Sequence, residues 1–191
     1  MIRFILDSGD PQEFREITQL AKEKGTELWG ATTNPSLIAK KAVEELQGKK
    51  ITKEEAFSLQ KELTLEILEI VPGAVSAEVY ADEKTTATEM IEQGMQIATR
   101  HERVVVKLPT TIEGFKARTE LRKQNIIINN TLGFHNNKFL QTESVLESAL
   151  PAGRQAWPCF ISPFVGRLDD IGENGMNLVR NGMKIKQTIQ T

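Results

Sequence analysis

The sequence predicts an α/β fold made of consecutive βα units around a parallel sheet. Short β-like runs alternate with longer helical patterns along the chain, no linker interrupts them, and polar residues gather where the predicted strands end. The chain has 191 residues, which is enough for one domain of ordinary size and too few for two. We therefore expect a single core.

The first two units have well-marked helix starts. The first strand is predicted over residues 2–6, and Asp10 is the expected N-cap of the helix that follows. The second strand is predicted over residues 28–31, after which Asn34 is expected to cap a helix that begins at Pro35.

The middle of the chain continues the alternation. A capping box at residues 52–55 predicts the start of a helix that ends before the Val71-Pro72-Gly73 turn. A third strand is predicted over residues 74–80. In the segment after it, apolar residues recur at helical spacing, which predicts a helix over residues 82–100.

The last units follow the same rule. Strands are predicted over residues 103–108, 126–132 and 159–162, with a capping box at residues 110–113 that starts the helix between the first two. The remaining expectations are a helix near residues 138–150, an irregular connection over 151–158 and a helical tail from Asn174.

Six βα units with polar strand ends suit a (β/α)8 barrel of the TIM type, whose active site is built at the carboxyl ends of several strands. Such barrels run to about 250 residues, and six strands cannot close an eight-stranded cylinder alone. We therefore expect a barrel that is incomplete at its C-terminus or that is completed by a partner.

Composition excludes several classes of function. The net charge of −2 gives no electrostatic basis for a nucleic-acid partner. No segment approaches the ~18 apolar residues of a membrane span and no signal segment is recognised, so the expected location is cytoplasmic, away from membranes. One cysteine, Cys159, excludes an internal disulfide, and His101 and His135 are too few for a structural zinc site.

Lys107 is the strongest candidate for chemistry, because it is the only charged residue in the apolar run 104–109. Desolvation favours the neutral form of an amine, and a neutral lysine amine attacks ketone carbonyls to form a Schiff base. The alternative is a strand-end lysine whose amine reaches solvent. Other lysines, such as Lys40 and Lys41, are expected to be solvated charges.

Two carboxylates stand where predicted strands end. Asp7 follows the first strand and Glu78 lies among apolar neighbours in the third. Either carboxylate can act as acid or base in aldol chemistry. Asp7 could instead be a turn residue, and Glu78 could be one half of a buried ion pair.

Uncharged polar side chains and one arginine complete the set of candidates. Thr33 and Asn34 end the second strand, and Asn129 and Thr131 fall on one face of the fifth. Their short side chains can bind hydroxyls or a water, although Asn34 could be only a helix cap. Arg167 can bind a phosphate with its planar fork, or pair with one of the two aspartates that follow it.

Five motifs lie at these strand ends in a fixed order along the chain. They are Leu6-Asp7-Ser8, Thr32-Thr33-Asn34-Pro35-Ser36-Leu37, Ser76-Ala77-Glu78-Val79, Val106-Lys107-Leu108-Pro109 and the SPFVGR run from Ser162 to Arg167. In sequence and order they resemble the motifs of the transaldolase family, in particular its small-subunit branch, which also includes fructose-6-phosphate aldolases. The resemblance covers about residues 1–180.

This resemblance implies transfer of a dihydroxyacetone unit from a ketose phosphate to an aldose phosphate, a reaction of the pentose phosphate pathway that needs no metal or organic cofactor. It implies that Lys107 forms the Schiff base, that Asp7 deprotonates the donor hydroxyl, and that Glu78 works with a water held by Thr131. The substrate-binding residues that it implies are Thr33, Asn34, Asn129, Ser162, Phe164 and Arg167, the last for the distal phosphate.

Glu78 and Phe164 favour transaldolase. At these two positions the chain resembles true transaldolases, whereas the aldolase branch tends to have glutamine and tyrosine. The alternatives are a fructose-6-phosphate aldolase, or an inactive sugar-phosphate-binding or assembly subunit that exposes strand edges. The chain ends at Thr191, where relatives continue into further strands. The expectation is therefore one barrel domain over residues 1–191 that lacks its C-terminal strands and can form a homo-oligomer.

Overall fold

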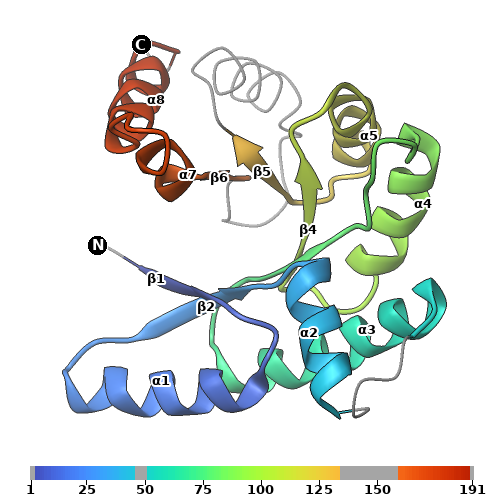
Figure 1. The fold of residues 1–191 in the computed structure, drawn as a ribbon, viewed down its shortest axis with the longest axis vertical. Helices are drawn as coiled ribbons and strands as arrows, with labels where there is room; N and C mark the ends of the chain where they lie inside the picture. The colour runs from blue at the N-terminus through green and yellow to red at the C-terminus, as the bar shows by residue number, and fades with distance from the viewer. Residues whose placement is uncertain (1–2, 46–50, 134–158, 190–191) are drawn as a thin grey trace. The chain divides into compact units, whose positions relative to one another are not determined.

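The computed structural model describes residues 3–45, 51–133 and 159–189, drawn as a ribbon in Figure 1. The chain divides into two compact units. The first unit consists of Met1–Tyr80 with Gln93–Val106, and the second of Ala81–Glu92 with Lys107–Thr191. The helix predicted near residues 138–150 and the connection predicted over 151–158 lie outside the described residues.

The first unit begins with three βα units. Its elements are β1 (Phe4–Asp7), α1 (Pro11–Glu23), β2 (Leu28–Thr32), α2 (Pro35–Glu45), α3 (Lys53–Ile70) and β3 (Val75–Glu78), together with parts of α4 (Ala87–Ala98) and β4 (Val104–Pro109). Helices α1 and α2 both pack against α3, as Figure 1 also shows.

The second unit holds the rest of α4 and β4 and all later elements. These are α5 (Ile112–Lys123), β5 (Ile128–Gly133), β6 (Phe160–Pro163), α7 (Val165–Asp169) and α8 (Met176–Ile189). The helical tail expected from Asn174 is confirmed as α8. The short helix α7, which follows β6 directly, has no counterpart in the sequence prediction.

The strands form one sheet in the order β1-β2-β3-β4-β5-β6. β1 pairs with β2, β2 with β3 and β5 with β6 in parallel register. Each strand therefore lies beside the next strand along the chain, with helices between them in sequence. This is the strand order of a (β/α)8 barrel, so the predicted fold class is confirmed, with six strands among the described residues.

Two predicted helix starts are confirmed by their hydrogen bonds. The Asp10 side chain accepts a bond from the backbone N–H of Gln12 (3.0 Å), and Thr52 forms the complete capping box with Glu55. Each cap supplies an acceptor for a backbone N–H that has no partner inside its helix, which is worth about 1 kcal/mol.

Two other helix starts were predicted wrongly. The helix expected from residue 82 begins at Ala87, because the Asp82 carboxylate accepts bonds from Lys84 and Thr85 (2.9 Å each) and holds a turn instead. Within the described residues, the capping box expected at residues 110–113 does not form. The cap of α5 is Thr111, one residue later than expected, and the Glu113 carboxylate accepts the backbone N–H of Ala87 instead (2.9 Å).

Each unit buries apolar side chains of its own. In the first unit they include Phe14, Ile38, Ile67, Val75 and Ile97, and in the second Leu108, Ala117, Leu121 and Ile128. Full burial of one large apolar side chain stabilises a fold by roughly 1.5–3 kcal/mol. The apolar runs that predicted strands and helices are therefore the ones that hold each unit together.

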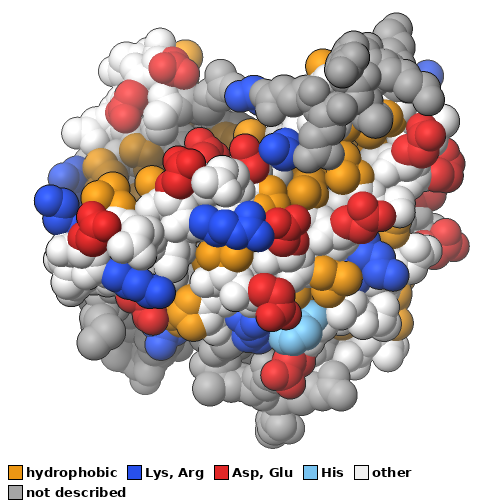
Figure 2. Space-filling model, turned by 90° about the horizontal axis from the view of Figure 1, so that it is seen from below, with side chains coloured by type: hydrophobic (Ala, Val, Ile, Leu, Met, Phe, Trp, Pro, Cys, Tyr) orange, Lys and Arg blue, Asp and Glu red, His pale blue; other side chains and the backbone are white. Residues whose placement is uncertain are grey.

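The surface carries charges of both signs. Figure 2 shows lysine and arginine interspersed with aspartate and glutamate on one face, among scattered apolar side chains. Across the described segments, no helix has both the length and the apolar character that crossing a membrane requires.

Candidate functional site

In the first unit, four predicted site residues stand at or just beyond the carboxyl ends of β1, β2 and β3. They are Asp7, Thr33, Asn34 and Glu78. Asp7 lies level with Thr32, and Thr32 with Ser76. Because the three strands run in parallel, their carboxyl ends form one edge of the sheet, as the sequence motifs predict.

Backbone and side-chain bonds fix the end of β2. The Thr33 N–H donates to the Ser76 carbonyl (2.9 Å), its hydroxyl donates to the same oxygen (3.3 Å), and the residue is fully buried. Asn34 accepts the backbone N–H of Leu37 through its side-chain oxygen (3.0 Å). The helix-cap interpretation of Asn34 is therefore confirmed, and its amide oxygen is engaged by the protein.

Glu78 is half-buried at the end of β3. Its backbone carbonyl accepts a hydrogen bond from the Gln60 amide of α3 (2.7 Å), and the Gln60 oxygen accepts one from Arg100 (2.9 Å). Burial lowers the pKa of Arg100 to about 10, which leaves it cationic at neutral pH. A chain of polar contacts from α3 and from the segment after α4 therefore holds the strand that presents the Glu78 carboxylate.

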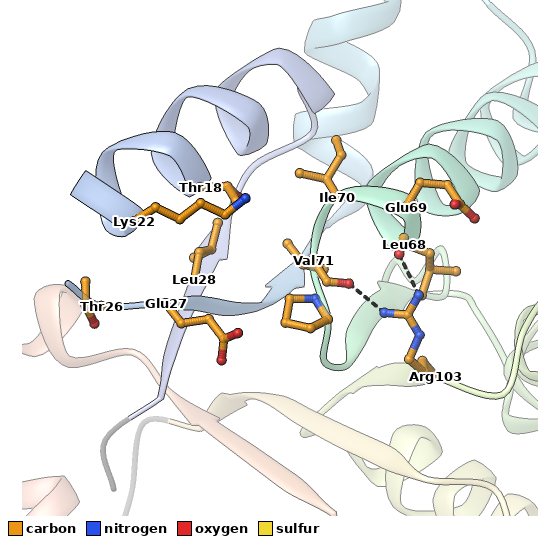
Figure 3. Close-up of a pocket in the computed structure, with 11 residues that line it drawn as sticks. Thr18, Lys22, Thr26, Glu27, Leu28, Leu68, Glu69, Ile70, Val71 and Arg103 are labelled. Atoms are coloured by element: carbon orange, nitrogen blue, oxygen red, sulfur yellow. Dashed lines mark hydrogen bonds between the residues drawn. The ribbon is translucent and has the colours of Figure 1, made fainter. Parts of the chain in front are cut away.

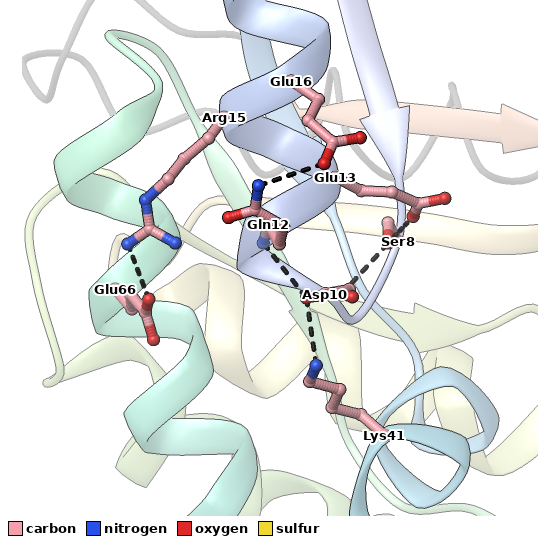
Figure 4. Close-up of polar contacts among 8 residues, drawn as sticks. All are labelled: Ser8, Asp10, Gln12, Glu13, Arg15, Glu16, Lys41 and Glu66. Carbon is pink, nitrogen blue, oxygen red and sulfur yellow. Dashed lines mark hydrogen bonds and ion pairs between the residues drawn. The ribbon is translucent and has the colours of Figure 1, made fainter. Parts of the chain in front are cut away.

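The loop after Asp7 is fastened in two ways, shown in Figure 4. The Ser8 hydroxyl donates to Glu13 and accepts the Asp10 N–H (3.1 Å). The Asp10 carboxylate pairs with Lys41 of α2 (3.1 Å), whose side chain is only 21% exposed. The expectation that Lys41 is solvated is therefore wrong.

This pair ties the β1–α1 loop to the helix that Asn34 caps. A methyl group at Gly9 would come within 2.9 Å of the Leu37 backbone, so loop and helix are in close contact. Sequence reasoning missed both Lys41 and Ser8. Nothing in the sequence marks a pair between residues 31 positions apart, because the contact exists only once α2 packs beside the loop.

Burial raises the pKa of Asp10, but hydrogen bonds from the Gln12 N–H and from Lys41 outweigh it, so the pKa lies below its ordinary value. A carboxylate with a lowered pKa stabilises the folded state at pH values above its ordinary pKa of about 3.9. This contribution is lost as the pH falls through the pKa of the folded state. We expect Asp10→Asn to cost at most about 1 kcal/mol at pH 7, because asparagine caps helices equally well and the ion pair is partly exposed.

Urea unfolding of Asp10→Asn and the wild type between pH 7 and pH 3 measures this difference, which should shrink as the pH falls. In a Lys41→Met background the same substitution should have almost no effect. An equal loss at both ends of the pH range would show that the charge of Asp10 is not the cause.

In the second unit, Lys107 is 3% exposed, and the whole of β4 is buried around it. The structure therefore does not place this lysine in solvent. The carboxyl ends of β4 and β5 are joined by two bonds to the Thr131 carbonyl, one from the Thr110 N–H (2.9 Å) and one from its hydroxyl (2.6 Å). Thr131 is fully buried, and its own hydroxyl has no partner among the described residues.

Strands β5 and β6 bring two more predicted residues together. The Ser162 hydroxyl donates to the Asn129 side-chain oxygen (2.8 Å), and Thr131 lies level with Ser162 in the register. Phe164 is the residue before the short helix α7. Arg167 has its backbone in α7, and its side chain lies outside the described residues.

A cavity of about 500 Å³ in the first unit lies at the other ends of the strands, as Figure 3 shows. Its lining includes Leu28, which starts β2, and Arg103, which precedes β4. The Arg103 guanidinium donates to the Leu68 and Val71 carbonyls (2.5 and 2.6 Å) and so completes the C-terminus of α3. This cavity contains none of the predicted site residues.

Within the described part of the chain, no group of three or more His, Cys, Asp or Glu side chains is placed to hold a metal ion. The donors at the strand ends are instead one amine, carboxylates, hydroxyls and amides. These groups can form covalent bonds to carbonyl carbons, move protons and bind sugar hydroxyls.

Comparison with known proteins gives a consistent result. Residues 4–191 match the family model described as transaldolase/fructose-6-phosphate aldolase. A probable transaldolase of Brevibacillus brevis is 40% identical over 180 residues, which are 94% of this chain and 68% of that protein. A probable transaldolase 1 of Bacillus cereus is 37% identical over 179 residues, 94% of this chain and 67% of that protein.

Among solved structures, an enolase of the mandelate racemase subgroup from Agrobacterium tumefaciens aligns with a TM-score of 0.34 and 7% identity, over 84% of this chain and 53% of its own. That score is too low to indicate a common fold. The family match and the two relatives extend over nearly the whole chain, and all five motifs fall within the residues that the family model matches. The chain therefore belongs to the transaldolase/fructose-6-phosphate aldolase family.

Proposed function

We propose that this chain is a class I transaldolase, which transfers a dihydroxyacetone unit between sugar phosphates of the pentose phosphate pathway through a Schiff base on Lys107. The observation that carries the proposal is the burial of Lys107, 3% exposed within an otherwise apolar strand. A lysine amine held out of solvent in an apolar strand is placed to condense with the carbonyl of a bound ketose, and a neutral lysine amine is the nucleophile in that reaction.

Thr131 supports the proposal from the neighbouring strand. A fully buried hydroxyl without a partner among the described residues is costly unless something else binds it. A water that moves protons during formation and hydrolysis of the Schiff base fits this role. Glu78 would exchange protons with that water, and Asp7 would take the proton of the donor hydroxyl as the carbon–carbon bond breaks.

The remaining polar residues would bind the sugar. Asn129 and Ser162 are bonded to each other (2.8 Å), so each holds the other in place to meet substrate hydroxyls. Thr33, Asn34 and Phe164 would line the substrate path, and Arg167 would bind the distal phosphate, for which a guanidinium is well shaped.

Transaldolase is favoured over fructose-6-phosphate aldolase by Glu78 and Phe164, and both relatives described above are named as probable transaldolases. The two activities differ in the fate of the three-carbon unit. A transaldolase keeps it on the enzyme until an aldose phosphate arrives, whereas an aldolase releases free dihydroxyacetone.

The proposal is tested by incubating the chain with fructose 6-phosphate, reducing with borohydride and analysing the peptides by mass spectrometry. We expect a reduced three-carbon adduct on the peptide that contains Lys107. Glucose 6-phosphate, which offers no ketone, is the control and should give none. A folded sample without an adduct would favour an inactive sugar-phosphate-binding subunit.

Product analysis separates the two activities. Without an aldose phosphate acceptor, we expect no steady release of dihydroxyacetone, and with the acceptor we expect a new ketose phosphate. Free dihydroxyacetone that accumulates without acceptor would identify an aldolase instead.

A further inference from the structure

The second unit contains a buried positive charge that lacks a full set of acceptors. Arg118 of α5 is 0% exposed. One of its terminal nitrogens, Nη1, donates to the Asn130 side-chain oxygen (3.2 Å), and its guanidinium carbon lies 4.4 Å from the centre of the Phe115 ring. Its Nε and Nη2 groups find no acceptor in residues 3–45, 51–133 or 159–189.

Such an arrangement is expensive, because a buried guanidinium loses its water and these contacts give it only a neutral amide and a ring. Burial lowers the pKa of Arg118 to about 10, and the electrostatic interaction with Cys159 acts in the opposite direction. Arg118 is therefore still cationic at neutral pH, and it favours a negative charge on a neighbouring group.

Two hydrogen bonds place Cys159 close to the bonded side chains of Arg118 and Asn130. The Cys159 sulfur accepts the backbone N–H of Ile128 (3.4 Å), and the Asn130 amide donates to the carbonyl of Phe160, the next residue after the cysteine (3.4 Å). Asn130 therefore links the Arg118 guanidinium to the residue that follows Cys159. Cys159 itself is half-buried directly before β6.

We propose that Cys159 is a modification site, a reactive thiolate held by the Arg118 guanidinium and the Ile128 N–H and open to small neutral oxidants and alkylating agents. A nearby cation and a hydrogen-bond donor both favour the thiolate over the thiol, and the thiolate is the nucleophile. In return, the thiolate gives Arg118 the counter-charge that its other contacts do not supply.

With a peroxide, the thiolate sulfur attacks one oxygen and the oxygen–oxygen bond breaks. The attacked oxygen keeps its hydrogen, so the sulfur is oxidised to sulfenic acid, and the other oxygen leaves as hydroxide, which a proton of the buffer converts to water. Cys159 is the only cysteine of the chain, so no second thiol of the same chain can close a disulfide with it. The modification is therefore expected to be reversed or capped by a small external thiol.

The test is the rate of alkylation of the folded chain by iodoacetamide between pH 5 and pH 10, followed by intact mass. Free thiols in unfolded chains reach half their maximal rate near about pH 8.5. We expect the native midpoint at least about one pH unit lower, and at pH 7 a reaction about tenfold faster than that of Arg118→Met. Dimedone should label the peroxide-treated wild type but not Cys159→Ser.

Arg122→Met is the matched control. Arg122 is also buried on α5, one turn after Arg118, but its guanidinium donates to the Ile126 carbonyl (2.8 Å). Its removal should leave the alkylation midpoint unchanged. Arg118→Lys, which keeps a cation, should react faster than Arg118→Met.

If Arg118→Met fails to fold, the wild type alone decides. The pH midpoint of its alkylation rate in the native state is then compared with the midpoint of the same chain unfolded in urea, at a concentration on the order of 8 M. A native midpoint at or above the unfolded one would overturn the proposal, as would equal rates in folded wild type and folded Arg118→Met. Neither outcome depends on sugar-phosphate activity, so the two proposals stand or fall separately.

Discussion

Lys107→Arg is expected to abolish the borohydride-trapped adduct and to lower turnover by at least about a thousandfold, equivalent to about 4 kcal/mol in the barrier. Arginine keeps much of the length of the side chain and, like lysine, is a hydrogen-bond donor. Its guanidinium stays protonated at any pH that the protein tolerates, so it has no electron pair with which to attack a ketone. The variant therefore removes the nucleophile while it keeps a long side chain at this position.

Lys107 is buried, so the larger guanidinium can strain β4. Lys107→Met, which is unbranched and apolar, serves as a second variant that also lacks the amine and fits a buried site more easily. Circular dichroism and a thermal melt establish that both variants are folded. Lys116→Arg is the control: Lys116 is an exposed lysine of the same unit, paired with Glu113 at 2.6 Å, and its substitution should leave trapping unchanged.

The measurement is the yield of adduct by peptide mass spectrometry, with turnover assayed in parallel. An adduct on a different lysine in folded Lys107→Arg would contradict the assignment of the nucleophile. Full turnover in that variant would contradict the Schiff-base mechanism as a whole.

The helix starts show which parts of the fold a sequence can predict. Asp10, Asn34 and Thr52 cap helices through bonds to residues two or three positions away, so the signal and the structure are equally local. The start of α4 was placed too early. Its apolar periodicity begins only at Ala87, and the polar residues 82–86 before it are held in a turn by hydrogen bonds to the Asp82 carboxylate. Those bonds compete with helix formation, as short polar side chains commonly do.

In the candidate site too, features set by the local sequence were predicted, and contacts that depend on packing were not. Lys107 was predicted from one charge in an apolar strand, and its burial is confirmed. The pair between Asp10 and Lys41 and the buried bond between Arg118 and Asn130 were not predicted. In sequence, the arginine stands among other charges on a helix and looks solvated. Its burial depends on how α5 lies on β5, which no local pattern specifies.

Gly114→Ala is expected to destabilise the chain by about 1–3 kcal/mol, the range for forcing an added methyl group into a packed site. Gly114 is buried in the first turn of α5, where its N–H donates to the Thr111 hydroxyl that caps the helix (3.0 Å). A β-carbon there would overlap the carbonyl oxygen of Pro109. That oxygen belongs to the backbone and cannot rotate away, so β4 or α5 must shift.

Gly166→Ala is the matched control, because Gly166 also lies in a helix of the second unit but has nothing within 4 Å of the added carbon. Alanine is the better helix former by about 0.8–1 kcal/mol, so this variant should be neutral or slightly more stable. Urea unfolding measures both, and equal stabilities for the two variants would contradict the close approach at Gly114. Because Pro109 follows Lys107 by two residues along β4, the shift that accommodates the methyl group should also reduce the rate of adduct formation in Gly114→Ala, while Gly166→Ala keeps the rate of the wild type.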